Sequence, residues 1–188
     1  MLTEQQGKIL IRLARQVISL QLGQKESAPV SPELLADPLL QAQQAVFVTL
    51  NKRGQLRGCI GSLIGTESIV DGVRRHALNA AFHDHRFSPV TDDEIQDLTI
   101  DISVLTEPEP LAYDDSADLV AKLRPGVDGV ILGDSSWASA TFLPQVWDQL
   151  PTAELFLGHL CRKAGLPEKA WQRRHLTIQT YQVQYFKE

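Results

Sequence analysis

The residues most able to do chemistry in this sequence are gathered in one short glycine-rich stretch, residues 54–61. Cys59 offers a thiol, and Arg57 offers a planar fork of N–H donors that suits a carboxylate or a phosphate. Gly58 and Gly61 flank the thiol, and glycine in a strand permits a bulge or the close approach of a ligand to the backbone. The stretch therefore predicts either a ligand-binding strand or a strand packed closely into a sheet.

Two roles are open to Cys59. A thiolate nucleophile needs a nearby cation or base, and Arg57 would share a face with Cys59 in a regular strand. The nearest histidines in the sequence are His76 and His83, one of which would have to serve as the general base. Free cysteine is also among the most buried residue types, so the sequence equally allows a packing role.

A second polar stretch, residues 83–89, follows an expected helix and contains Asp84 and Arg86, which can pair with each other. The spacing of His83 and His85 would place two imidazoles on one side of an extended segment. The sequence supplies no third and fourth ligand at a recognisable spacing, so we expect a solvated loop and neither a metal nor another cofactor.

The remaining chemistry-bearing residues carry weaker signals. Asp128 stands between two glycines, which is typical of a turn first and of a site second. Cys59 and Cys161 lie far apart, and neither has a partner at metal-like spacing, which is typical of a reduced cytoplasmic protein. The sequence contains no phosphate-binding loop, dinucleotide fingerprint or serine-hydrolase elbow.

Length and charge limit the class of protein. A chain of 188 residues suits one domain with a substantial core. A net charge of −5 and the lack of a dense basic run argue against a nucleic-acid partner. No apolar run is long enough to span a bilayer, so we expect no membrane partner.

Hydrophobic spacing distributes these residues over a mixture of helices and hairpins. Helices are expected over residues 3–22, 68–82, 115–123 and 152–164. Strands are expected over residues 45–50, 55–61, 98–105, 130–132, 138–143 and 176–186, with loops over 24–32 and 133–136. Because strands and helices do not alternate regularly, we expect an α+β fold with a mainly antiparallel sheet flanked by helices.

Six separated segments together resemble the AMMECR domain family. They are residues 56–61, 84–89, 102–108, 126–130, 142–146 and 160–166, in the order that the family has them. The resemblance implies a single AMMECR-type domain over residues 1–188, with a larger and a smaller subdomain and residues 56–61 beside a cleft between them. It also makes Asp84, Arg86 and Asp128 candidates for the ligand site.

The resemblance implies a component of the AmmeMemoRadiSam system, whose members travel with a Memo-like protein and a radical S-adenosylmethionine protein. On this basis we expect binding of a small anionic ligand or a partner segment at the glycine-rich strand. Arg57 and Arg86 would hold the negative charge, and Gly58 and Gly61 would admit the ligand to backbone N–H groups. The alternatives are a thiol enzyme with Cys59 as nucleophile and a structural adaptor whose glycines serve packing only.

Overall fold

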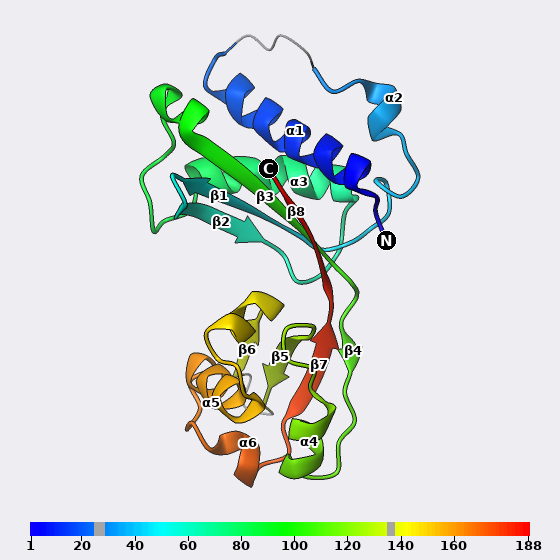
Figure 1. Ribbon diagram of the computed structural model, residues 1–188, viewed down its shortest axis with the longest axis vertical. Helices are drawn as coiled ribbons and strands as arrows, with labels where there is room; N and C mark the ends of the chain where they lie inside the picture. Colours follow the sequence, from blue (N-terminus) through cyan, green and yellow to red (C-terminus); the bar gives the residue numbers. More distant parts are fainter. Residues whose placement is uncertain (25–28, 135–137) are drawn as a thin grey trace. The chain divides into compact units, whose positions relative to one another are not determined.

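A computed structural model describes residues 1–24, 29–134 and 138–188 of the chain. The chain divides into two compact units, Met1–Leu105 with Gln184–Glu188 and Thr106–Val183. Each unit has its own hydrophobic core and its own four-stranded sheet (Figure 1). The expected α+β class is confirmed, with two sheets in place of one. The loops expected over residues 24–32 and 133–136 lie partly outside the described residues.

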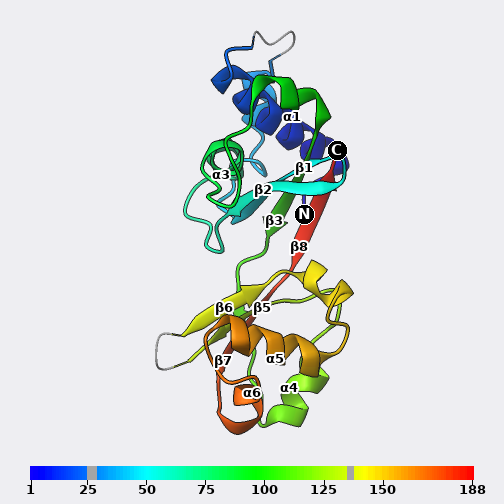
Figure 2. The ribbon, with the colours of Figure 1, turned by 90° about the vertical axis from the view of Figure 1, so that its left-hand side faces the viewer.

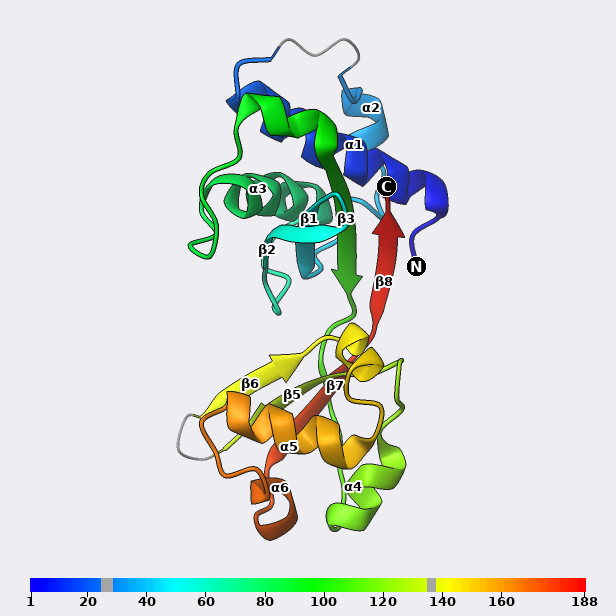
Figure 3. The same ribbon diagram turned by 60° about the vertical axis from the view of Figure 1, so that its left-hand side comes forward.

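The first unit is a sheet with two helices on one face. Its strands are β1 (Val46–Lys52), β2 (Gln55–Gly61), β3 (Leu98–Leu105) and β8 (Val183–Lys187), in the order β2-β1-β3-β8. Its helices are α1 (Glu4–Gln21), α2 (Pro32–Leu35), α3 (Ile69–Phe82) and the 3₁₀ helix η1 (Asp92–Asp97). β1 pairs antiparallel with β2 and β3, which leaves β2 at an edge. Figure 3 shows α1 and α3 on the same side of this sheet.

Local sequence signals explain these elements. α1 begins with a capping box, in which the Gln6 backbone N–H donates to Thr3 Oγ1 and the Thr3 N–H donates to the Gln6 side chain. In β1 the buried residues alternate with half-buried ones, and Val48 and Leu50 face the helices. The sheet therefore gives its apolar face to the helices, and its other face carries half-buried residues such as Thr49.

The second unit is a sheet covered by short helices. Its strands are β4 (Glu109–Pro110), β5 (Gly129–Gly133), β6 (Ser139–Phe142) and β7 (Thr177–Tyr181), in the order β4-β7-β5-β6. Its helices are α4 (Ser116–Lys122), α5 (Ala153–Lys163), α6 (Ala170–Arg173) and the 3₁₀ helix η2 (Pro144–Asp148). α5 lies across one face of the sheet (Figure 2), where Phe156 stacks on Trp147 with ring centroids 3.9 Å apart.

The last strand differs from its prediction. Residues 176–186 form two strands, and β7 belongs to the second sheet whereas β8 belongs to the first. Gln182 separates them because its backbone bonds elsewhere: its N–H donates to Thr106 Oγ1 at 2.9 Å, and its carbonyl accepts from the Thr106 N–H at 2.9 Å. No glycine or proline marks this break, so the β-rich pattern reads as one strand.

No helix in the described parts of the chain combines the length and apolar character needed to cross a bilayer.

Candidate functional site

A β-bulge at Arg57 decides which way the side chains of β2 face. Leu50 and Asn51 are adjacent in β1, but their partners in β2 are Gly58 and Leu56, so the residue between these two partners, Arg57, has no partner on β1. Beyond the bulge, Gly58 lies opposite Leu50, and Cys59 lies opposite Thr49. Because a one-residue slip exchanges the two faces of a strand, the bulge turns Cys59 away from the apolar face of the sheet.

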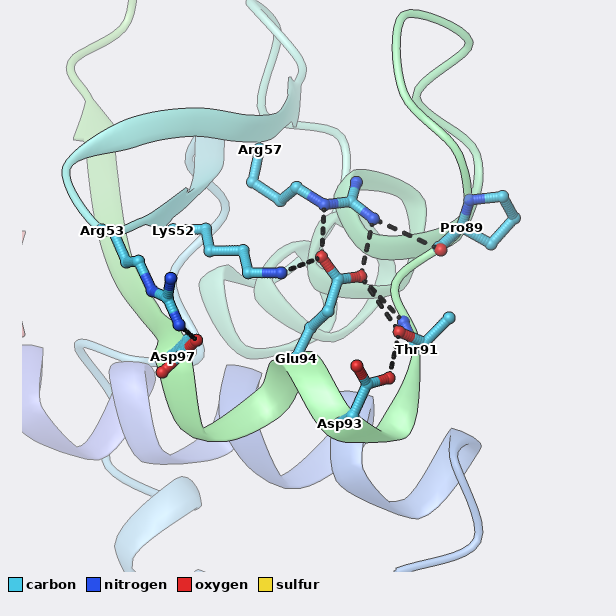
Figure 4. A network of polar contacts seen from close by, with 8 residues as sticks. All are labelled: Lys52, Arg53, Arg57, Pro89, Thr91, Asp93, Glu94 and Asp97. Carbon is cyan, nitrogen blue, oxygen red and sulfur yellow. Dashed lines mark hydrogen bonds and ion pairs between the residues drawn. The ribbon is translucent and has the colours of Figure 1, made fainter.

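The Arg57 guanidinium is bound by a carboxylate of η1 (Figure 4). Its Nε donates to Glu94 Oε1 at 3.1 Å, and its Nη2 donates to Glu94 Oε2 at 2.9 Å and to the Pro89 carbonyl at 3.3 Å. Lys52 Nζ lies 2.8 Å from the same carboxylate. These contacts, led by the Arg57 hydrogen bonds, lower the pKa of Glu94 well below its ordinary value although burial opposes the shift. The positive charge of Arg57 is therefore compensated by the carboxylate of Glu94.

Arg57 and Cys59 do not share a face, contrary to the prediction. Glu94 binds Lys52 together with Arg57, and Lys52 lies on the same face of β1 as the buried Leu50. The prediction assumed a regular strand, in which residues two apart point the same way, and the bulge breaks that regularity.

Both glycines that flank the thiol are in close contact with the protein itself. A Cβ atom at Gly58 would overlap the carbonyl oxygen of Ala80 in α3. A Cβ atom at Gly61 would overlap the ring of Phe47 and its neighbouring backbone. The space that these glycines leave is thus filled by packing, which is the role that the adaptor alternative gave them.

The side chains of the loop after α3 bind the backbone of Cys59. The Cys59 N–H donates to Asp84 Oδ2 at 2.9 Å, and Arg86 Nη2 donates to the Cys59 carbonyl at 3.3 Å. On the sheet face, Thr49 Oγ1 donates to the half-buried Cys59 Sγ at 3.3 Å. Two of the segments that resemble family motifs, residues 56–61 and 84–89, therefore meet at the backbone of Cys59.

Asp84 holds Arg86 in a fixed position, as expected from the sequence; we call this pair the first clamp. Arg86 donates from Nε to Oδ1 at 2.9 Å and from Nη2 to Oδ2 at 2.7 Å. The Asp84 side chain is 4% exposed, whereas that of Arg86 is 57% exposed. The Arg86 hydrogen bonds are the largest cause that lowers the pKa of Asp84 well below its ordinary value. Within the described residues, Arg86 Nη1 has no hydrogen-bond partner, so one donor nitrogen remains for a ligand.

Asp128 belongs to the second unit and forms a similar pair, the second clamp. Arg124 donates from Nε to both carboxylate oxygens at 3.1 Å, from Nη2 to Oδ1 at 2.6 Å and from its backbone N–H to Oδ2 at 2.9 Å. The side chains are 3% exposed for Asp128 and 57% for Arg124. The Asp128 carbonyl accepts from Trp147 Nε1 at 2.7 Å. The expected ligand-site residues are thus distributed over both units.

The sequence of this chain is similar to sequences of known proteins. A sequence model of the AMMECR1 family matches residues 11–186. The chain belongs to the AMMECR1 family. It is 38% identical to a protein of Methanothermobacter thermautotrophicus, with 100% of this chain and 96% of that protein covered. It is 36% identical to a protein of Methanopyrus kandleri, with 100% and 90% covered.

A solved structure shares the AMMECR1 fold. The crystal structure of an uncharacterized protein from Pyrococcus horikoshii superposes with a TM-score of 0.84 at 32% identity. The match covers 100% of this chain and 93% of that one. The family and the fold class expected from the sequence are therefore confirmed.

The other titratable groups considered from the sequence differ in accessibility. His76 is 2% exposed in the core of the first unit, and burial is the largest cause that lowers its pKa. Cys161 is fully buried in α5, and burial raises the pKa of its thiol. Within residues 1–24, 29–134 and 138–188, no three His, Cys, Asp or Glu residues are placed to hold a metal.

Three residues of this AMMECR1 protein escaped the sequence analysis. Glu94 is the acidic residue of a capping box, a local role that does not indicate its contact with Arg57. Thr49 lies opposite Cys59 only because of the bulge. Arg124 lies four residues before Asp128, but the turn between them gives no helical signal that would pair the two side chains.

Proposed function

We propose that this AMMECR1 protein binds a small anion, a carboxylate or a phosphate, at Arg86 beside the thiol of Cys59. The single observation that carries the proposal is the first clamp: a guanidinium held by a buried carboxylate and still 57% exposed. A planar cation that is already fixed can donate to an anion with little further loss of side-chain freedom. Bound at Arg86, the anion would lie next to the thiol, because the same guanidinium donates to the Cys59 carbonyl.

Arg86 suits an anion better than Arg57 because of its exposure. Glu94 takes two donor nitrogens of Arg57, whose side chain is only 12% exposed. Arg86 also pairs with a carboxylate, so the first clamp as a whole carries no net charge. Recognition at Arg86 therefore depends on direct hydrogen bonds at short range more than on long-range attraction.

The setting of this activity is a further part of the proposal. We propose that the protein works in the cytoplasm as a component of the AmmeMemoRadiSam system, with a Memo-like protein and a radical S-adenosylmethionine protein. Membership of the AMMECR1 family supports this assignment. Co-expression with a Memo-like protein, followed by size-exclusion chromatography, tests the contact. Co-elution supports direct binding, whereas separate elution at matched concentrations counts against it.

One observation favours thiol chemistry as a second candidate. Thr49 Oγ1 donates to the sulfur of Cys59 at 3.3 Å, and the Arg86 guanidinium donates to the carbonyl of the same residue. A hydroxyl donor and a nearby cation both favour a thiolate. An anionic substrate at Arg86 would then lie within reach of a nucleophile. Of the two histidines named as candidate bases, His76 is buried in the core.

Competing alkylating agents test the anion site at the thiol itself. Iodoacetate is anionic, iodoacetamide is neutral, and both alkylate a thiolate, so the ratio of their rates at Cys59 reports the local attraction for an anion. In a Cys161→Ala background, we expect Arg86→Gln to lower this ratio about fivefold. That corresponds to about 1 kcal/mol, the typical net contribution of one hydrogen bond.

Arg74→Gln is the matched control, because Arg74 forms an exposed ion pair with Asp71 on α3. This variant should leave the rate ratio unchanged. An unchanged ratio in Arg86→Gln would overturn the anion proposal. Alkylation by either reagent that begins only on unfolding would exclude a nucleophilic Cys59. In that case, titration of the amide resonances with inorganic phosphate, in wild type and Arg86→Gln, decides whether Arg86 binds an anion.

A further inference from the structure

A small polar pocket of about 180 Å³ lies within the second unit. At about 30 Å³ for each water molecule in the liquid, it has room for about six waters and so for a small ligand. The residues that shape it come from β4 and the chain before it, from the turn before β5 and from the end of β7. Two segments that resemble family motifs, residues 102–108 and 126–130, thus meet in a place that the proposed anion site does not use.

One wall of the pocket is the second clamp. Asp128 accepts from Nε, Nη2 and the backbone N–H of Arg124, and Trp147 Nε1 donates to the Asp128 carbonyl. The guanidinium is therefore fixed although its side chain is 57% exposed. In the described parts of the chain, Arg124 Nη1 has no hydrogen-bond partner. The wall thus presents a positioned donor that suits a carboxylate.

The opposite charge comes from Glu107 and Glu109. Both side chains are exposed and line the pocket, and neither forms a hydrogen bond or ion pair with any residue that the structure describes. The pocket is therefore lined by three acidic residues, Asp128 included, and by one arginine. A simple anion at Arg124 would be repelled by the two glutamates, and a simple cation near them would be repelled by Arg124.

A ligand with both charges satisfies both sets of groups. A hard metal ion is a poor occupant, because no three acidic, His or Cys residues in the described chain are placed to ligate one. We propose that this pocket binds a small zwitterion of the free α-amino acid class. Its ammonium group contacts Glu107 and Glu109, and its carboxylate accepts from Arg124 Nη1. This site is independent of the proposed anion site at Arg86.

The test uses the full chain, labelled with ¹⁵N and titrated with each of the common L-amino acids. We expect at least one of them to shift the amide resonances of pocket residues such as Thr106 and Gln182. Acetate and methylammonium, which each carry one half of the zwitterion, should bind at least about tenfold more weakly, because each makes only one of the two charged contacts. No shift with any amino acid, or equal binding of either half, would overturn the proposal.

Variants separate this site from the rest of the protein. Glu107→Gln should weaken binding of the amino acid about tenfold, as the loss of one charge-assisted contact implies. This variant should leave the fold intact, because Glu107 has no partner in the described structure. Arg173→Gln, an exposed arginine of α6, is the matched control and should leave binding unchanged. Full binding in Glu107→Gln, or loss of binding in Arg86→Gln, would assign the signal to another place.

Discussion

The two clamps are built alike but hold different parts of the chain together. In each, a buried aspartate accepts from Nε and Nη2 of an arginine whose side chain is 57% exposed. Asp84 also accepts from the N–H of Cys59, 25 residues away in the sequence, and so fastens a loop to the edge of β2. Asp128 also accepts from the N–H of Arg124, its own ion-pair partner, and so closes a short turn.

The comparison shows the same side-chain pair in two different surroundings. Beside the first clamp stands a thiol on a sheet face, whereas beside the second stand two unpaired glutamates. The pair itself supplies a fixed guanidinium in both places, and the difference between its neighbours is the reason that we propose an anion for the first clamp and a zwitterion for the second. The same reasoning predicts that the two clamps differ in their contribution to stability.

Loss of the first clamp should have the largest effect. Asp84→Ala removes the acceptor for Cys59 N–H and for Arg86, and we expect it to lower the free energy of unfolding by about 3 kcal/mol. Asp128→Ala should cost less, about 1–2 kcal/mol, because the groups it frees lie in one short turn that water can reach. Urea unfolding followed by circular dichroism measures both. Equal losses would show that the long-range contact of Asp84 adds no stability.

Two strand glycines, Gly58 in the first unit and Gly133 in the second, differ in the space around them. Gly58→Ala should lower the free energy of unfolding by about 2 kcal/mol, because its Cβ would overlap the Ala80 carbonyl on a rigid helix. Gly133→Ala in β5 is the matched control: the nearest atom to its Cβ is Thr177 Cβ, at 3.9 Å, which is ordinary contact. We expect that change to stay within about 0.5 kcal/mol. A tolerated Gly58→Ala would mean that the glycine serves something other than packing.

Much of this architecture could be predicted from the sequence, because most of its signals are local. The capping box at Thr3, the hairpin of β1 and β2, and the pairing of Asp84 with Arg86 all depend on residues close in the chain. The six segments identified the family. Local signals of this kind can be interpreted without any knowledge of the tertiary structure.

The remainder could not be predicted, because it depends on contacts between distant residues. The glycines near Arg57 are compatible with a bulge and with a closely packed regular strand, so the sequence does not indicate the bulge. The bulge nevertheless determines which face of the sheet Cys59 occupies. Glu94 meets Arg57 only when η1 lies beside β2. The break at Gln182 separates two strands with one continuous β-rich pattern, and its cause is a hydrogen bond to Thr106.

Acid should weaken the protein through carboxylates such as Asp84 and Glu94. Their folded-state pKa values lie well below the ordinary values of 3.8 and 4.5, so the unfolded chain binds more protons at low pH. Their contribution is complete above about pH 5 and is lost as the pH falls through the ordinary values toward the folded ones. We expect protonation of each of these two carboxylates to lower the free energy of unfolding by about 1–2 kcal/mol between pH 5 and about pH 2.5. Urea unfolding at each pH measures the loss.

Asp84→Asn isolates the share of the first clamp in this acid sensitivity. The variant starts from a lower stability at neutral pH, but its stability should fall less steeply with acid, because the shifted carboxyl of Asp84 no longer titrates. An acid dependence as steep as that of the wild type would mean that Asp84 has an ordinary pKa, and that its contacts with Arg86 do not favour the ionised form.

The smallest effect is expected at an exposed pair of the same length. Arg53 and Asp97 lie 2.8 Å apart, close to the 2.7 Å of the first clamp, but Asp97 is 38% exposed whereas Asp84 is 4% exposed. Because water and salt screen an exposed pair, Asp97→Asn should change the free energy of unfolding by less than about 0.5 kcal/mol. A loss close to that of Asp84→Asn would show that distance, and not burial of the carboxylate, determines the strength of these pairs.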